Sequence, residues 1–385
     1  MGKNTARWVA YVLGLALPLF VLSLTAVHIL YRINVRPYLE FARDSQAKNL
    51  QAYLEDINYL SRFELLRPRT EGTTDAGTVL NAKVFWAPKP EDFRLTHPGA
   101  AKPIVPPPIR EELLRLRYEW MEKSFKARRM KADLSFFDHL RNFDHWNIEI
   151  GSPIEDLTKA HLFIPPVRLP IPEVSDLLAA AKLRLMQGDI NKDSLKALSD
   201  VRELARLLLT TESMQMVLAG LAILDEERMA YRHFVDKGVL ESTAWSPVDR
   251  NITRRARRAI LATREFLHLW TPEASIKEIF LGVNLPPGFC AAANEAFPIN
   301  YSLRPLLEPR LIFELSLRNE YTIIDSVFER AQSGCRLRYL KGLAEADAFD
   351  IDIPAPLVLS RIPYSRKVFA LRLSVLNFGG FDAYK

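Results

Sequence analysis

The 385-residue sequence predicts a mainly α-helical protein: a single N-terminal transmembrane helix, then an irregular helical domain with a small C-terminal β element. Three observations lead to this fold class. One early stretch lacks charge over the length of a membrane span, apolar residues then recur mainly at helical spacing, and β-branched and aliphatic residues gather near the end. Apolar residues make up 48% of the chain, which is enough for a substantial buried core.

Residues 8–31 form the predicted transmembrane helix. Between residues 9 and 30 the sequence contains no Asp, Glu, Lys or Arg. A helix of that length, at ~1.5 Å per residue, spans ~33 Å, about the hydrocarbon thickness of a bilayer. Trp8 and Tyr31 lie at its ends, where aromatic rings favour the interface with lipid headgroups. Because the apolar core is longer than that of a cleaved signal peptide, we expect residues 1–7 to remain as a short basic tail.

Two arguments oppose each other on the orientation of this span. A count of basic residues slightly favours the C-terminal flank as the cytoplasmic one. A short basic tail before an apolar run is typical of an uncleaved signal anchor, and long domains translocate largely regardless of charge. We expect a single pass through the inner (cytoplasmic) membrane, with the large C-terminal domain outside the cytoplasm.

The two cysteines of the chain, Cys290 and Cys335, bear on the same question. Exported chains pair their cysteines more often than cytosolic chains do. A bridge between these two would close a loop of about 45 residues and contribute roughly 4 kcal/mol in the chain-entropy model. Spacing does not decide between a disulfide and two unrelated thiols. No further ligands lie close enough for a zinc site, and the sequence predicts no cofactor.

Residues 38–66 are predicted to form a membrane-proximal stalk helix. Its apolar residues repeat at spacings of three and four, at Leu50, Tyr53, Ile57 and Leu60. One interpretation is the seam of a parallel coiled-coil dimer, and the other is packing of the helix on its own domain. Only about two heptads are regular, whereas a coiled coil needs three or four, so the pattern favours packing on the domain.

Residues 67–110 are predicted to form a proline-rich linker. They hold eight of the 25 prolines, and the run Val-Pro-Pro-Pro at 105–108 favours extended, stiff backbone. Phe85 and Trp86 require cover from water, so we expect the linker to wrap over the fold. Residues 79–86 are predicted to form a short strand within it.

Residues 111–272 form the predicted helical domain. Apolar periodicity predicts helices over residues 109–131, 173–186, 194–211, 214–237 and 248–270, with a short segment at 136–146. Gly188 and Gly238 are expected to end the helices that precede them. The apolar run at 214–224 is too short to cross a bilayer, so we expect it to be buried in the core.

Residues 177–205 resemble a tetratricopeptide-type helical hairpin. The run LLAAAKLRLMQGD supplies small residues that let two helices approach closely, then a Gly-Asp turn. The resemblance covers no more than about one repeat, and no second copy follows at the 34-residue period of such arrays. It therefore implies close helix-on-helix packing. Residues 273–385 are expected to be mixed α/β, with a turn at 286–288, a helix at 311–332 and strands at 357–360 and 367–376.

Two Asp-His pairs, Asp138-His139 and Asp144-His145, are the candidates for a polar site. A carboxylate beside a histidine can orient the imidazole as a general base. The histidines are six residues apart, whereas two metal ligands on one helix face would be four apart. Aromatic neighbours favour a structural role for these pairs, and the sequence predicts neither a catalytic residue nor a metal ligand.

A basic run on the helix at 248–270 is the strongest surface signal. Arg250, Arg254 and Arg258 recur every four residues, with Arg257 beside them, and apolar residues occupy the opposite face. This face is either simply solvated or contacts lipid headgroups, an acidic protein or an anionic cell-wall polymer. A net charge of +6 suits such partners. Nucleic acid is not expected, because neither interleaved aromatics nor a known binding module is present.

These features predict a membrane-anchored helical scaffold or accessory subunit of a cell-envelope assembly, without catalytic activity. Its expected partners are membrane lipid and either another protein or further copies of the chain. Two alternatives remain. One is a membrane-anchored envelope hydrolase that uses the Asp-His pairs, and the other is a helical interaction module that faces the cytoplasm.

Overall fold

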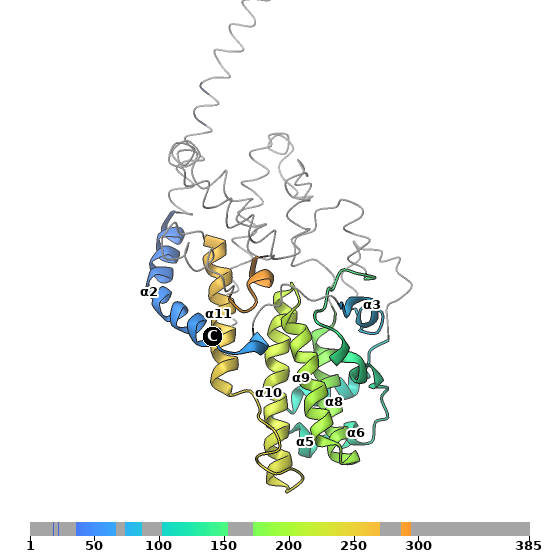
Figure 1. The fold of residues 1–385 in the computed structure, drawn as a ribbon. Helices are drawn as coiled ribbons and strands as arrows, with labels where there is room; N and C mark the ends of the chain where they lie inside the picture. Colours follow the sequence, from blue (N-terminus) through green and yellow to red (C-terminus); the bar gives the residue numbers. More distant parts are fainter. Residues whose placement is uncertain are drawn as a thin grey trace, which may run out of the picture. The chain divides into compact units, whose positions relative to one another are not determined.

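The computed structural model describes residues 36–66, 74–86, 102–152, 172–269 and 286–293, together with Pro18 and Leu22. This part of the chain is mainly α-helical, as the sequence predicts, with eleven helices (Figure 1). Its only β pairings are two isolated bridges, Asp75 with His145 and Trp86 with Pro172. The expected C-terminal strands lie outside the described residues.

No helix within the described ranges is both long enough and apolar enough to cross a bilayer. The predicted span at residues 8–31 lies outside those ranges, apart from Pro18 and Leu22. The transmembrane helix therefore stays a prediction.

Two compact units divide the chain, residues 1–52 and 53–385. Helix α2 (Arg36–Leu60) runs from the first unit into the second and is followed by the short helix η1 (Glu64–Leu66). The predicted stalk helix thus ends six residues early. Within the second unit, Tyr53 and Leu60 are buried by the chain itself, and the Tyr53 hydroxyl lies 2.9 Å from the Thr263 hydroxyl.

Those two residues belong to the four of the predicted dimer seam. The other two, Leu50 and Ile57, are half-buried. The burial of Tyr53 and Leu60 therefore favours packing of α2 on its own domain, and a dimer through this seam stays a prediction.

Three helices form the centre of the second unit: α8 (Val174–Asn191), α9 (Ser194–Leu209) and α10 (Met214–Asp236) (Figure 1). They pack on one another, and the apolar start of α10 is buried as predicted. Gly188 lies inside α8, so its predicted role as a helix end is wrong. A Cβ there would come within 2.5 Å of the Ala197 Cβ, so glycine serves close packing of α8 on α9. The helix ends instead at Asn191, and its C-cap residue Lys192 has a positive φ of 56°.

The single helix predicted at 109–131 is broken into three: α4 (Pro107–Arg115), α5 (Trp120–Lys123) and α6 (Phe125–Arg128). The break lies at Arg117, whose φ of 43° is left-handed and costly for a residue other than glycine. It brings Trp120 and Met121 into the core beside Leu113. The predicted short segment at 136–146 is the 3₁₀ helix η2 (Ser135–Asn142).

The strand predicted at 79–86 is also wrong. Residues Gly77–Leu80 form the helix α3, and turns follow it. Leu80 and Val84 are both buried and lie four residues apart. Ala82, between them, is exposed, whereas a strand would place residues 80, 82 and 84 on the same face.

Helix α11 (Arg250–Leu269) runs antiparallel to the end of α2. Tyr53 meets Thr263, and Asp56 meets Arg258, so later residues of α2 meet earlier residues of α11. The turn predicted at 286–288 is present, because the Phe289 N–H donates to the Pro286 carbonyl and Gly288 has a φ of 66°.

Candidate functional site

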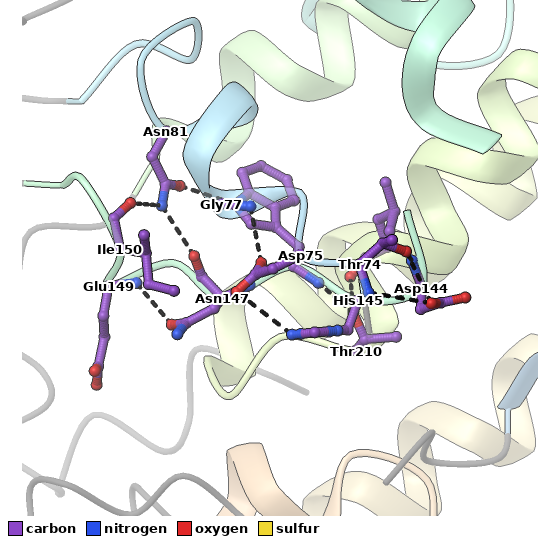
Figure 2. Close-up of polar contacts among 12 residues, drawn as sticks. Thr74, Asp75, Gly77, Asn81, Asp144, His145, Asn147, Glu149, Ile150 and Thr210 are labelled. Carbon is purple, nitrogen blue, oxygen red and sulfur yellow. Dashed lines mark hydrogen bonds and ion pairs between the residues drawn. The ribbon is translucent and has the colours of Figure 1, made fainter. Parts of the chain in front are cut away.

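The candidate site is the junction between residues 74–86 and residues 144–150 (Figure 2). Asp75 is its first anchor, because one carboxylate oxygen accepts from the backbone N–H groups of Gly77 at 2.8 Å and Asn147 at 2.9 Å. The other oxygen lies 3.4 Å from Nε2 of His145. A Cβ on Gly77 would come within 2.3 Å of the Asn147 carbonyl, so only glycine fits at this position.

Asn81 is the second anchor of the junction. Its amide nitrogen donates to the carbonyls of Asn147 at 2.9 Å and Ile150 at 2.8 Å. The amide oxygen of Asn81 accepts a hydrogen bond from the indole N–H of Trp146 at 2.8 Å. Its backbone carbonyl accepts one from the indole N–H of Trp86 at 2.9 Å. The buried side chain of Asn81 thus fastens residues 146–150, while its backbone holds buried Trp86.

Further contacts fasten residues 144–146 to helix α9. The Asp144 carboxylate accepts from the Thr74 hydroxyl at 2.8 Å. Arg206 of α9 donates to the backbone carbonyl of Asp144 at 3.0 Å. The backbone N–H of Trp146 donates to the hydroxyl of Thr210, just after α9, at 3.0 Å. The junction is therefore a multiply bonded joint among three parts of the chain.

The structure separates the two predicted Asp-His pairs. Asp138 and His139 are exposed on η2, where Asp138 pairs with Lys196. A hydrogen bond from Lys196 lowers the pKa of the Asp138 carboxyl. Asp144 and His145 lie instead in the junction. The four residues do not form one site, and the described residues hold no group of three side chains suited to a metal ion.

A second cluster lies around Lys182 of α8, whose side chain is 2% exposed. Its ammonium lies 3.2 Å from the Glu226 carboxylate of α10 and donates to the Leu113 carbonyl at 3.2 Å and the Arg117 carbonyl at 3.5 Å. The Trp120 indole donates to the same carboxylate at 2.6 Å. The ammonium therefore satisfies a carbonyl that the end of α4 leaves without a helical partner.

Burial disfavours the charged forms of both Lys182 and Glu226. It lowers the pKa of Lys182 and raises the pKa of Glu226, while each group partly offsets the effect on the other. Two buried charges that satisfy each other hold α4, α8 and α10 in one arrangement.

A third cluster is centred on Glu227, which is fully buried on α10. It accepts from Arg202 of α9 and, at 2.6 Å, from the Trp245 indole, and burial raises the pKa of its carboxyl. The Arg202 guanidinium lies 4.2 Å from the centre of the Trp245 ring. The connection between α10 and α11 is thereby fixed to two helices.

The predicted basic face lies on α11. Arg250 and Arg254 are exposed there. Arg258 binds the buried carboxylate of Asp56 through two contacts of 2.5 and 2.7 Å, and Arg257 donates to Asp225 at 2.6 Å. Two of the four predicted arginines thus have acidic partners within the chain.

Cys290 is disulfide-bonded, and the other cysteine of the chain, Cys335, lies outside the described residues. Because Cys335 is not among the described residues, the disulfide between the two cysteines stays a prediction. Cys290 follows the turn at 286–288 and is half-buried.

Sequence reasoning singled out Asp144 and His145 of the junction, but it missed its two anchors, Asp75 and Asn81, and the Lys182 cluster. Asp75 and Asn81 lie in the stretch predicted to be a linker, although Asp-Ala-Gly there is a turn signal. Lys182 and Glu226 stand on the apolar side of their helices. A charged residue at a core position of a helical pattern requires a buried partner, and that signal was available.

These networks hold segments together, and their carboxylates accept mainly from backbone N–H groups, arginines, a lysine and indoles. Comparisons with models of protein families, with curated proteins and with solved structures find no match. No relative therefore suggests a reaction for these residues.

Proposed function

We propose that the chain is a membrane-anchored, non-catalytic helical scaffold or accessory subunit of a cell-envelope assembly. Residues 8–31 are its anchor in the inner membrane, and the helical domain lies outside the cytoplasm. The proposal includes a small β element within residues 273–385. The anchor, the location and the β element are supported by the sequence pattern alone.

One observation carries the non-catalytic part of this proposal: the buried charges of the described domain are placed where elements meet. Asp56 joins α2 to α11, Glu226 of α10 binds Trp120 of α5 and Lys182 of α8, and Glu227 joins α9 to the connection after α10. Breaking such pairs is costly, so they fix one arrangement of the helices. A domain fixed in this way presents constant surfaces, which is what a scaffold requires.

Native assembly size tests this proposal. A tagged full-length chain is crosslinked in intact cells, extracted in mild detergent and sized. We expect a discrete membrane-bound complex that is larger than the chain with its micelle. The variant Leu15→Arg/Leu22→Arg places two charges in the apolar segment, at a cost of roughly 2.5–3.5 kcal/mol each on an insertion scale. This variant is expected to leave the membrane fraction and to lose the complex.

Two results would contradict the proposal. One is a wild-type chain that sizes as a monomer in its micelle after crosslinking. The other is a charge-inserted variant that stays in the membrane fraction with an unchanged complex.

A further inference from the structure

The solvent side of α11 carries a short stripe of arginine and leucine. Arg250, Arg254 and Leu261 follow one another at spacings of four and seven residues, which places them along one side of the helix. Both arginines are exposed, and the Leu261 side chain is 42% exposed. We call these three residues the α11 stripe.

The arginines beside the α11 stripe are already paired within the chain. Arg257 on one side of the stripe binds Asp225 of α10, and Arg258 on the other side binds Asp56 of α2. Arg254 donates to the amide oxygen of Asn251, at 2.9 Å. Within the described ranges, neither Arg250 nor Arg254 has a carboxylate partner.

The contact between α2 and α11 shows which chemistry suits this helix. Asp56 offers a carboxylate from an antiparallel helix to both Arg255 and Arg258, and the Tyr59 ring lies 4.6 Å from the Arg255 guanidinium. The stripe lies to one side of the surface that faces α2, because Arg255 and Arg258, which bind Asp56, stand further round the helix than Arg250 and Arg254. Among the described residues, no carboxylate is offered to the stripe arginines in this way.

We propose that the α11 stripe docks an acidic segment of a protein partner, whose carboxylates pair with Arg250 and Arg254 while an apolar side chain covers Leu261. Arginine presents a planar fork that matches a carboxylate with two hydrogen bonds. An exposed leucine in line with the arginines offers the apolar contact that protein interfaces combine with polar ones. This inference rests on the proposed scaffold function, for which it names the docking surface and the chemistry of the partner.

Binding to poly-L-glutamate tests the chemistry directly. Full-length chain in detergent micelles is titrated with this polymer, with inorganic polyphosphate and with phosphatidylglycerol vesicles. We expect Arg250→Glu/Arg254→Glu to raise the Kd for poly-L-glutamate at least about tenfold, because opposite charges become like charges at the contact. The control Arg232→Glu/Lys237→Glu makes the same change of charge at exposed positions of α10 and its end, and should change the Kd by less than about twofold.

Equal losses in both variants would assign binding to net charge and overturn the inference. Stripe-dependent binding of polyphosphate or of vesicles, without stripe-dependent binding of poly-L-glutamate, would also overturn it, because the stripe would then be a phosphate or lipid surface.

The complex formed in cells separates this inference from the proposed function. Loss of the complex in Arg250→Glu/Arg254→Glu, with the chain still in the membrane, supports docking at the stripe. An unchanged complex in that variant overturns the inference and leaves the scaffold proposal standing. Absence of any complex with the wild-type chain overturns the scaffold proposal, and poly-L-glutamate binding still decides the chemistry of the stripe.

Discussion

Lys182→Met is expected to lower the free energy of unfolding by about 3–5 kcal/mol, the usual cost of removing one partner from a buried ion pair. The loss arises because the Glu226 carboxylate stays buried with only the Trp120 indole as its donor. The Leu113 carbonyl at the end of α4 also loses its ammonium contact. Denaturant titration of the full chain in micelles measures the change.

The matched control for this variant is Lys182→Met/Glu226→Leu. It removes both charges and fills similar volume with apolar atoms, which is often neutral or stabilising in proteins. The Trp120 N–H then lacks an acceptor, so we expect the double variant to be within about 2 kcal/mol of the wild-type chain. A double variant as unstable as Lys182→Met would show that the unpaired carboxylate is not the cause.

Trp146→Ala is expected to lower the free energy of unfolding by about 3–5 kcal/mol, the second large effect. The Trp146 side chain is 1% exposed, and its N–H is the donor to the amide oxygen of Asn81. Its removal leaves a cavity and an unsatisfied buried oxygen together. We also expect faster hydrogen exchange at residues 74–86, because Asn81 fastens that segment.

Trp146→Phe reduces the cavity while removing the same hydrogen bond, since it keeps a smaller aromatic ring without the N–H. We expect it to cost about 1–3 kcal/mol, the range for one unsatisfied buried group. Unchanged hydrogen exchange at residues 74–86 in Trp146→Ala would contradict the role assigned to the junction.

The long helices of the domain were predictable from sequence. Helix α10 ends within one residue of its prediction, and α9 within two. Their apolar residues repeat over several turns, and that repetition encodes a packed face without knowledge of its neighbours. Gly188 was misjudged because the local signal for a helix end and the need for close contact with Ala197 both select glycine.

The break at Arg117 was not predictable in the same way. Its left-handed backbone conformation accompanies a contact of its carbonyl with Lys182, 65 residues away along the chain. The junction poses the same problem, since Asp75 meets Asn147 across 72 residues. Apolar periodicity describes one helix or strand at a time. It therefore does not predict contacts between residues that are far apart in the sequence.

The basic face of α11 was predictable only in part. Helical spacing placed Arg250, Arg254, Arg257 and Arg258 on one side of the helix, and the structure keeps them near its solvent side. The acidic partners of Arg257 and Arg258 come from α10 and α2, so sequence spacing could not separate the paired arginines from the exposed ones.

Labelling of Cys290 and Cys335 in intact cells tests whether the anchored domain lies outside the cytoplasm. The reagent is a membrane-impermeant maleimide, applied before and after reduction. We expect labelling only after reduction, because an exported domain carries the two cysteines as a disulfide. Intact cells that stay unlabelled even after reduction, with both cysteines reactive without reductant in lysed and denatured cells, would contradict it and place the domain in the cytoplasm.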